Sequence, residues 1–347
     1  MSAAIAPGAT VLVSGAAGYI GSVLVRELLA GGYRVVALDR FFFGRESLSG
    51  AGSAERLVLR QKDIRDIEAD DLAGIDAVCD LAALSNDPSG AIDPALTRAI
   101  NHVGRRRLSA AAKRAGVRRY VLSSSCSVYG AGTAPELDET APVAPLTAYA
   151  ESTLRAESDA LALAGDGFCP VALRNATVFG VSPRMRFDLV INLMTLHAVE
   201  RGTITVMGGG RQWRPLVHVS DVARAFRSAL EAPAARVSGQ VFNVGLCNLQ
   251  VRSLAFIVRE TLPIPVAVSI APDDADRRDY SIGFGKARAQ LGFVARVSVE
   301  DGIREIYDAL KYGRVENGPR TVTVGWYRAI LDAKALIGAI ELDGRVL

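Results

Sequence analysis

The most constraining feature of this chain is a glycine-spaced turn that joins a short apolar strand to a helix. The apolar run 11–13 leads into a turn with Gly15, Gly18 and Gly21, and an amphipathic stretch comes directly after it. Gly15 permits a tight turn, Gly18 lets backbone approach a pyrophosphate, and Gly21 lets the helix pack closely on the strand. The helix N-terminus offers free N–H groups to phosphates. The spacing predicts a dinucleotide-binding turn; a purely structural glycine turn is the alternative.

An acidic residue stands where a dinucleotide-binding unit needs one. Asp39 ends the next apolar run, and its carboxylate can accept a hydrogen bond from a ribose 2′-OH. Because it would repel a 2′-phosphate, we expect NAD rather than NADP, although the adjacent Arg40 tempers that preference. The turn Asp63-Ile64-Arg65 after the third strand either hydrogen-bonds the adenine or is a solvated acidic turn.

Alternation of apolar runs with helical stretches fixes the expected fold class. Strands are predicted at 10–14, 34–38, 56–60, 77–81, 119–124 and 169–174, and helices at 19–31, 94–115 and 147–164. Such alternation is typical of an α/β protein with a doubly wound parallel sheet, whose ligand crevice lies at the carboxyl ends of the strands. A strand at 240–244 and a helix opened by Ser220-Asp221 are expected to return to this sheet.

We therefore expect one Rossmann domain made of residues 1–175 and about 216–245. Residues 176–215 and 246–312, with frequent glycine and proline and short elements, are predicted to form a smaller α/β lobe that closes over the crevice. Residues 313–347 are expected to form a tail with one helix at 326–338, for which the sequence indicates no function.

Composition excludes several functional classes. No apolar run approaches the ~20 residues that a membrane-spanning helix needs, and the first residues lack a basic signal-peptide region, so we expect a cytoplasmic protein without a membrane partner. The four cysteines lie far apart, which argues against a metal site. The net charge of +3 is scattered, and Arg105-Arg106-Arg107 falls within a predicted helix where successive side chains diverge. Nucleic-acid binding is therefore not expected.

Further motifs extend the pattern beyond the glycine turn. They are Leu81-Ala82-Ala83, Asn101, the segment 123–130 (Ser-Ser-Ser-Cys-Ser-Val-Tyr-Gly) and Tyr149. Together they resemble the extended short-chain dehydrogenases/reductases, and more narrowly the NAD-dependent nucleotide-sugar epimerases and dehydratases, of which UDP-galactose 4-epimerase is a familiar member. The resemblance covers roughly residues 9–312. It implies NAD as cofactor, a nucleotide-diphosphate sugar as substrate bound in the smaller lobe, and a homodimer formed through the helices at 94–115 and 147–164.

The resemblance also implies roles for individual residues. Tyr149 matches the base that takes a sugar hydroxyl proton, and Ser125 matches the hydroxyl residue beside it. Asn101 matches an asparagine lining the cofactor pocket. Asn192 and Arg214 match residues that contact and clamp the diphosphate, a role that suits the planar guanidinium.

Two sets of contacts are expected from the motifs and the resemblance. The expected cofactor-binding residues are Gly15, Gly18, Tyr19, Ile20, Gly21, Asp39, Arg40, Asp63, Ile64, Leu81, Ala82, Ala83, Asn101, Ser123, Tyr149 and Thr153. The expected substrate-binding residues are Ser85, Asn86, Ser125, Cys126, Asn175, Thr177, Arg184, Arg186, Asn192, Arg214 and Arg277. Ser85 and Asn86 are alternatively a helix-capping turn, and the arginines are alternatively ordinary surface residues.

One position departs from the family pattern. The family has Tyr-x-x-x-Lys, whereas Thr153 stands four residues after Tyr149 in this chain. Positions i and i+4 share a helix face, so the family's lysine reaches the nicotinamide ribose and lowers the tyrosine pKa. Thr153 can hydrogen-bond a ribose hydroxyl but carries no charge. Its presence leaves three hypotheses open: a slow enzyme or one with another base such as Cys126 or His102, a deliberate substitution, or a protein that only binds.

The two residues after Ser125 limit which reactions are expected. In the related 4,6-dehydratases an Asp-Glu pair stands where this chain has Cys126 and Ser127. Removing water requires a general acid and base, so dehydration is disfavoured, and Asp39 disfavours a reductase that uses NADPH. We therefore expect an epimerase that transiently oxidises a ring carbinol, most simply at C4. Another nucleotide-sugar oxidoreductase or lyase, and a binding protein without turnover, remain the alternatives.

Overall fold

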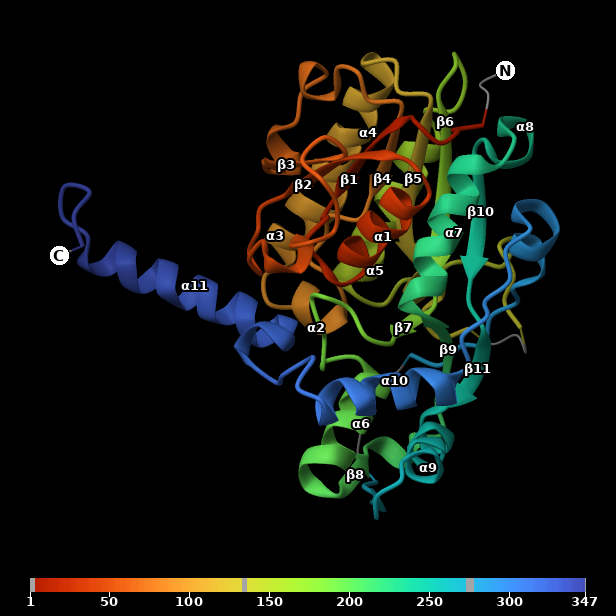
Figure 1. Ribbon diagram of the computed structural model, residues 1–347, viewed down its shortest axis with the longest axis vertical. Coiled ribbons are helices and arrows are strands. Elements are labelled where there is room, and N and C mark those ends of the chain that lie inside the picture. The colour runs from red at the N-terminus through yellow and green to blue at the C-terminus, as the bar shows by residue number, and fades with distance from the viewer. Residues whose placement is uncertain (1–3, 133–135, 273–277, 347) are drawn as a thin grey trace.

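A seven-stranded parallel sheet forms the centre of the computed structural model, which describes residues 4–132, 136–272 and 278–346 (Figure 1). The strand order is β10-β6-β5-β4-β1-β2-β3. The strands are β1 (Thr10–Ser14), β2 (Arg34–Asp39), β3 (Leu57–Gln61), β4 (Ala77–Asp80), β5 (Arg119–Ser125), β6 (Cys169–Asn175) and β10 (Gln240–Val244). Progression along the sheet reverses between β1 and β4, the switch point where such folds bind ligands. The predicted fold class is confirmed, and the strand boundaries move by no more than a residue.

Helices cover both faces of this sheet. On one face α1 (Tyr19–Ala30) packs against α7 (Val219–Glu231), and on the other α4 (Arg105–Arg114) packs against α5 (Ala148–Leu161). Along β1, Val11 and Val13 join the core beneath α1 and α7, whereas Leu12 joins the core beneath α4. Successive strand residues point to opposite faces, so a strand covered on both sides is apolar throughout.

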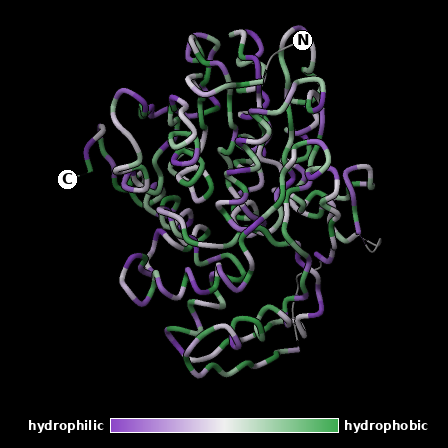
Figure 2. The backbone as a smooth tube through the Cα atoms, turned by 45° about the vertical axis from the view of Figure 1, so that its right-hand side comes forward, coloured by the Kyte–Doolittle hydropathy of each residue, from purple (hydrophilic) through white to green (hydrophobic). Residues whose placement is uncertain are grey.

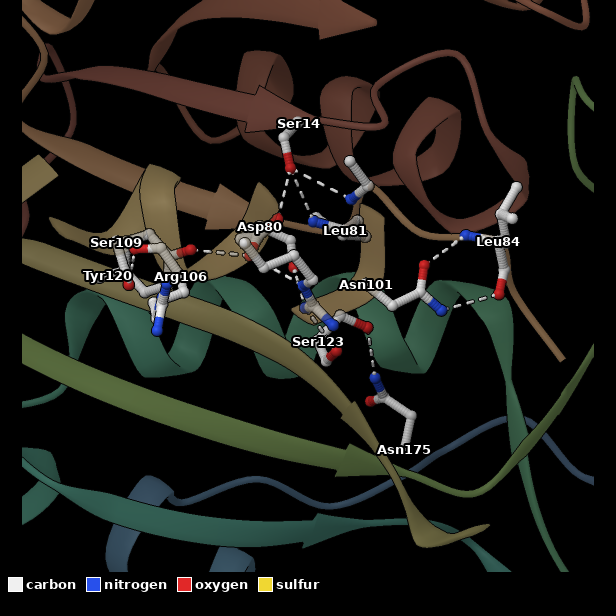
Figure 3. Close-up of polar contacts among 12 residues, drawn as sticks. Ser14, Asp80, Leu81, Leu84, Asn101, Arg106, Ser109, Tyr120, Ser123 and Asn175 are labelled. Atoms are coloured by element: carbon white, nitrogen blue, oxygen red, sulfur yellow. Dashed lines mark hydrogen bonds and ion pairs between the residues drawn. The ribbon is translucent and has the colours of Figure 1, made fainter. Parts of the chain in front are cut away.

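The predicted helix at 94–115 is interrupted. It consists of α3 (Pro94–Arg98), a π-helical segment (Ala99–Gly104) and α4. Within the wider turn, Asn101 is fully buried and forms two hydrogen bonds with the backbone of Leu84, at 2.8 and 3.0 Å (Figure 3). A π-helical turn inserts an extra residue into a helix and often occurs near functional sites. Periodicity alone predicts a continuous helix and cannot show such an insertion.

The remaining elements lie mostly below the carboxyl ends of the sheet (Figure 1). A three-stranded sheet has the order β11-β9-β7, and β12 pairs with β8. The bounds are β7 (Thr177–Phe179), β8 (Thr203–Val206), β9 (Trp213–His218), β11 (Cys247–Gln250), β12 (Ala267–Ile270), α2 (Asp87–Gly90), α6 (Val190–Arg201), α8 (Ala234–Val237), α9 (Val251–Thr261) and α10 (Val299–Lys311). The expectation of only short elements here was wrong, because α6, α9 and α10 have 12, 11 and 13 residues. The exact division of the chain into domains stays a prediction.

The tail contains one long helix, α11 (Thr323–Ile340), which begins three residues before the predicted start. Its first turn lies against the body, and the rest projects outward (Figure 1). In the part of the chain that is described, no helix has the length and apolar character needed to cross a membrane. Hydrophobic and hydrophilic residues are interspersed along the backbone (Figure 2).

Candidate functional site

A cavity of about 750 Å³ opens at the switch point of the sheet and is closed on its far side by residues that come after β7 and β9. Most of the expected site residues lie on its wall. They are Gly15, Gly18, Tyr19, Ile20, Gly21, Asp39, Arg40, Asp63, Ile64, Leu81, Ala82, Ala83, Ser85, Asn86, Ser123, Ser125, Tyr149, Asn175, Thr177, Arg184, Arg186 and Arg214. Asn101, Cys126, Thr153 and Asn192 do not, and Arg277 falls outside the described residues.

Tight backbone packing shapes the glycine turn. Gly15 has φ +68°, and a Cβ there would lie 2.9 Å from the backbone nitrogen of Ala82. A Cβ on Gly21 would lie 2.1 Å from the carbonyl oxygen of Gly15. Ser14 fixes the neighbouring strand ends, because its hydroxyl donates to Asp80 at 2.7 Å and accepts from the backbone N–H of Leu81 at 3.0 Å (Figure 3). Only glycine fits at positions 15 and 21 without moving backbone.

The acidic residue at the end of β2 is held by the turn itself. The carboxylate of Asp39 accepts from the N–H groups of Ala17, at 2.9 Å, and Phe41, at 2.7 Å. Burial raises the pKa of Asp39, and these N–H groups offset part of the rise. Two backbone donors thus fix the carboxylate on the cavity wall while each oxygen keeps acceptor capacity.

Asp63 is engaged by two arginines. Its carboxylate accepts from Arg40 and from both the side chain and the N–H of Arg65. Burial raises the pKa of Asp63, but the hydrogen bonds from Arg65 and Arg40 outweigh it and hold that pKa well below its usual range. The carboxylate expected to reach the adenine is therefore already paired, and the charge of Arg40 is compensated.

Tyr149 lies in the first turn of α5, which is capped by Thr147. The Thr147 hydroxyl accepts from the N–H of Ala150 at 3.1 Å and donates to Asp87 of α2. Helix α2 comes close to the tyrosine, since a Cβ on Gly90 would lie 2.8 Å from the Cβ of Tyr149. The Ser125 hydroxyl, at the end of β5, lies beside the phenol and lowers its pKa. The expected pair of Tyr149 and Ser125 is thus brought together on one wall.

The opposite wall carries arginines that have partners. Arg186 donates to Asp188 through two nitrogens, both at 2.9 Å, and to Ser85 through the third at 3.0 Å. The Asn86 amide also donates to Asp188, at 3.1 Å. The Asn86 oxygen caps α2 by accepting from the N–H of Ser89 at 2.9 Å. The helix-capping interpretation of Asn86 is thus observed, on a residue that also lines the cavity.

Arg184 lies nearer the dinucleotide turn. Its guanidinium is 3.6 Å from the ring centroid of Phe43 and donates to Thr323 at 3.0 Å. Burial lowers the pKa of Arg184 to about 10, and Asp39 acts on it in the opposite direction. This arginine therefore faces the half of the cavity that contains Asp39.

Four expected residues lie away from the cavity wall, and two of them are asparagines with structural roles. Asn192 is fully buried and its amide bonds Tyr19, Arg186 and the backbone of Gly180. Asn101 holds the backbone of Leu84 through its two hydrogen bonds. Both asparagines therefore hold residues of the cavity wall, and their direct contact with a ligand stays a prediction.

Cys126 and His102, the alternative bases, also lie off the wall. The thiol of Cys126 is buried and donates to the Arg174 carbonyl at 3.2 Å, and burial raises its pKa. His102 Nε2 lies 2.8 Å from Asp159. Thr153 is 1% exposed, and its hydroxyl has no hydrogen-bond partner among the described residues. None of the three lines the cavity.

The structure adds residues that sequence reasoning did not select. Arg105, Asp188, Thr323 and Tyr327 all line the cavity. Arg105 lies in the basic run of the predicted helix, four residues after Asn101. This spacing could have indicated that the two side chains share a helix face. No sequence pattern placed the tail residues Thr323 and Tyr327 at the cavity. Their position depends on contacts between the tail and the phenylalanines at 42 and 43.

Comparison with known proteins agrees with this geometry. Residues 11–245 match the NAD dependent epimerase/dehydratase family. A UDP-glucose 4-epimerase of Mycolicibacterium smegmatis is 33% identical over 84% of this chain and 95% of its own length. A dTDP-glucose 4,6-dehydratase of an Actinoplanes species is 31% identical over 92% of this chain and 98% of its own.

Solved structures show the same likeness. MoeE5 in complex with UDP-glucose and NAD is 31% identical and has a TM-score of 0.77, covering 88% of this chain and 100% of that one. The relatives carry out different reactions, so they identify the family and not the reaction. This chain belongs to the NAD dependent epimerase/dehydratase family, the nucleotide-sugar enzymes of the extended short-chain dehydrogenase/reductase type.

Proposed function

We propose that this protein is an NAD-dependent nucleotide-sugar epimerase that acts at a ring carbinol, C4 in the simplest case. The observation that carries the proposal is the pairing of Tyr149 with Ser125 on the cavity wall, where the carboxylates from α2 and from the segment after β7 are already held by arginines. A proton-transfer pair is present, whereas an elimination needs a further acid and base.

The residues of the first wall fit NAD. A pyrophosphate can approach the backbone only where Cβ atoms are missing, as at Gly15 and Gly21. Asp39 is fixed where it can accept from a ribose hydroxyl, and Arg40, which could have favoured a 2′-phosphate, is paired with Asp63. When bound, NAD supplies the hydride acceptor and then the hydride donor. We assign Arg184 to this half of the site rather than to the sugar.

The chain's own residues manage the proton. The phenolate of Tyr149 takes the proton of the sugar hydroxyl as the carbinol becomes a ketone, and Ser125 holds the same oxygen. After the keto sugar presents its other face, Tyr149 returns the proton. Arg214 and Arg186 line the opposite wall, and Arg186 keeps two N–H groups beyond its bonds to Asp188 and Ser85. In this proposal the two guanidinium groups hold the diphosphate and limit where the sugar can turn.

Dehydration is disfavoured because the nearest carboxylates are engaged. Asp87 is bound by Arg278 and Thr147, and Asp188 by Arg186 and Asn86. A carboxylate paired with a guanidinium is a weak base, because the cation stabilises its charged form. Cys126, which stands where the dehydratases have an acid, is buried behind the wall.

The test is proton NMR of the purified protein with UDP-glucose, UDP-galactose, dTDP-glucose and UDP-glucuronate in D2O. The proposal predicts an epimer without deuterium at any ring carbon, because the hydride never exchanges with solvent. Deuterium at C5 or in a methyl group would indicate elimination, and loss of CO2 from UDP-glucuronate would indicate decarboxylation. Line broadening of a sugar without turnover would indicate a binding protein.

We also propose a homodimer formed through the helical layer α3, α4 and α5. Val103, in the π-helical segment of this layer, is 47% exposed and is an apolar side chain that such a contact would cover. Light scattering after size exclusion should give twice the mass of 36.7 kDa. The variant Val103→Asp should shift the mass toward the monomer; a monomeric parent would contradict the proposal.

A further inference from the structure

The family's lysine position carries no charge in this chain, and the basic residue described on the same helix, Arg155, is exposed to solvent. Thr153 is buried off the cavity wall, and its hydroxyl has no partner among the described residues. A cation beside a phenol stabilises the phenolate and lowers its pKa. A cation from another element can supply this effect to Tyr149.

Arg105 reaches the same cavity from the neighbouring helix. It is the first residue of α4, directly after the π-helical segment, and α4 packs against α5. Its side chain is 2% exposed and lines the cavity together with Tyr149 and Ser123. A fully buried arginine is rare unless it is paired or functional.

The guanidinium of Arg105 is fixed by two strand ends. Nε donates to the Asp80 carboxylate at 2.9 Å, and Nη2 donates to the carbonyl oxygens of Asp80, at 3.0 Å, and Ser123, at 2.7 Å (the acceptors are labelled in Figure 3). Nη1 makes no hydrogen bond to the residues that the structure describes. The charge is therefore held rigidly at the carboxyl ends of β4 and β5, with donor capacity left over.

Four groups act on the phenol of Tyr149 in addition to burial. Burial and the carboxylate of Asp87 raise its pKa, whereas Ser125, Arg105 and Arg186 lower it. The pKa stays above its ordinary value, so losing either cation would raise it further.

Several other charged groups around α5 form ion pairs, as Arg105 does with Asp80. Asp87 is paired with Arg278, His102 with Asp159 and Arg174 with Glu157. Arg186 uses all three of its nitrogens on Asp188 and Ser85. Arg105 lines the cavity from the same helical layer as Tyr149, and its remaining nitrogen is not engaged by the described residues.

We propose that Arg105 supplies, from α4, the positive charge beside Tyr149 that position 153 lacks, and that it acts on the reaction through that phenol. The family's lysine position lies on α5, whereas Arg105 lies on α4, the helix packed against it. This proposal rests on the proposed function only in taking Tyr149 as the base. Arginine suits the place because it stays charged when buried.

The test is a direct titration of residue 149. Site-specific incorporation of 3,5-difluorotyrosine at position 149 brings the phenol into a pH range where the protein stays folded, and 19F NMR reports its ionisation alone. Arg105→Met should raise this pKa by about one unit or more, a roughly tenfold loss of phenolate at a given pH. Arg105→Lys, which keeps the charge, should leave it near the parent value, and Thr153→Lys added to Arg105→Met should lower it again.

A paired control covers misfolding. Arg105→Met leaves the buried carboxylate of Asp80 without its cation, so the double variant Asp80→Asn/Arg105→Met is compared with Asp80→Asn alone. An unchanged titration after Arg105→Met, or an equal shift after Arg105→Lys, would overturn the proposal. The titration needs no sugar, so failure of the epimerase assignment in the D2O assay and failure of this proposal are separate results.

Discussion

The two walls of the cavity are built from different parts of the chain. On the β1 and β2 side, the turn at Gly15 and Gly21 and two backbone N–H groups on Asp39 define the surface. On the far side, side chains from several elements define the surface, among them Arg186, which is held by Asp188. A backbone wall depends on missing side chains, whereas a side-chain wall depends on partners brought together by the fold.

Because the two walls are built differently, we expect substitutions in them to affect different functions. The backbone wall tolerates almost no substitution, and it serves a cofactor common to the whole family. In the side-chain wall, a single substitution can remove an ion pair or change its partners. We therefore expect the identity of the sugar to be determined there, and variants on the two walls to fail in different assays.

The largest expected effect is that of Tyr149→Phe, which lies between the two walls. Removing the phenol oxygen removes proton transfer and leaves the ring packed against α2, so turnover in the NMR assay should fall by about 100-fold to 10,000-fold. NAD content after purification and the melting temperature should stay at the parent values. A variant that keeps a tenth of the activity would exclude Tyr149 as the base.

The next largest effect is that of Asp188→Asn on the side-chain wall. The substitution leaves Arg186 buried without its acid, which should lower the free energy of unfolding at pH 7 by about 3 kcal/mol. Burial raises the pKa of Asp188, but Arg186 outweighs it and holds that pKa below its usual value. The contribution is therefore complete above about pH 4 and is lost as the pH falls further.

Thermal unfolding of the parent and of Asp188→Asn between pH 7 and pH 3 measures the contribution of the Arg186–Asp188 pair to stability. The gap between the two melting temperatures should narrow as the carboxyl is protonated. A gap that stays constant over that range would show that the pair does not stabilise the wall through charge.

Gly21→Ala tests the backbone wall. Its Cβ would lie 2.1 Å from the carbonyl oxygen of Gly15, so the turn must shift, at a cost of about 2 kcal/mol. Retention of NAD through purification should drop, while Gly285→Ala, where a Cβ meets nothing within 4 Å, should behave as the parent. Equal NAD content in both variants would mean that the turn is only structural.

The same contrast explains what could be predicted from the sequence. The turn from Gly15 to Gly21 and the position of Asp39 are local, so spacing along the chain reveals them. The charge on Arg105 could not be assigned, because its position depends on a π-helical insertion and on Asp80 and Ser123, which lie on two strands. Asn192 matched the family motif and is nevertheless buried among polar partners, Tyr19 of α1 and the backbone of Arg186.

The helices that the sequence did not predict are of two kinds. Helix α6 buries residues on more than one side, which weakens its periodicity, whereas α9 and α10 each bury a single face and could have been predicted. The sequence predicts a helix in the tail but not its place at the cavity, because no local pattern shows where a helix docks.

The smallest expected effect concerns this tail, which adds a side-chain patch to the backbone wall. The ring of Tyr327 lies 5.4 Å from that of Phe43 and 6.3 Å from that of Phe42, and the indole of Trp326 donates to the Phe42 carbonyl at 2.6 Å. Phe42, Phe43 and Tyr327 all line the cavity on the Asp39 side. Aromatic contacts of this kind contribute about 1 kcal/mol each, so Tyr327→Ala should weaken NAD binding by about fivefold.

Calorimetric titration of the NAD-free protein with NAD measures this change. Leu336→Ala is the matched control, because Leu336 lies on the same helix, is 62% exposed and is absent from the cavity wall. Turnover at saturating NAD should be unchanged in both variants, because neither residue touches the phenol. If Tyr327→Ala binds NAD as tightly as Leu336→Ala, the tail only covers the protein surface, and the cofactor wall is made by the first strands alone.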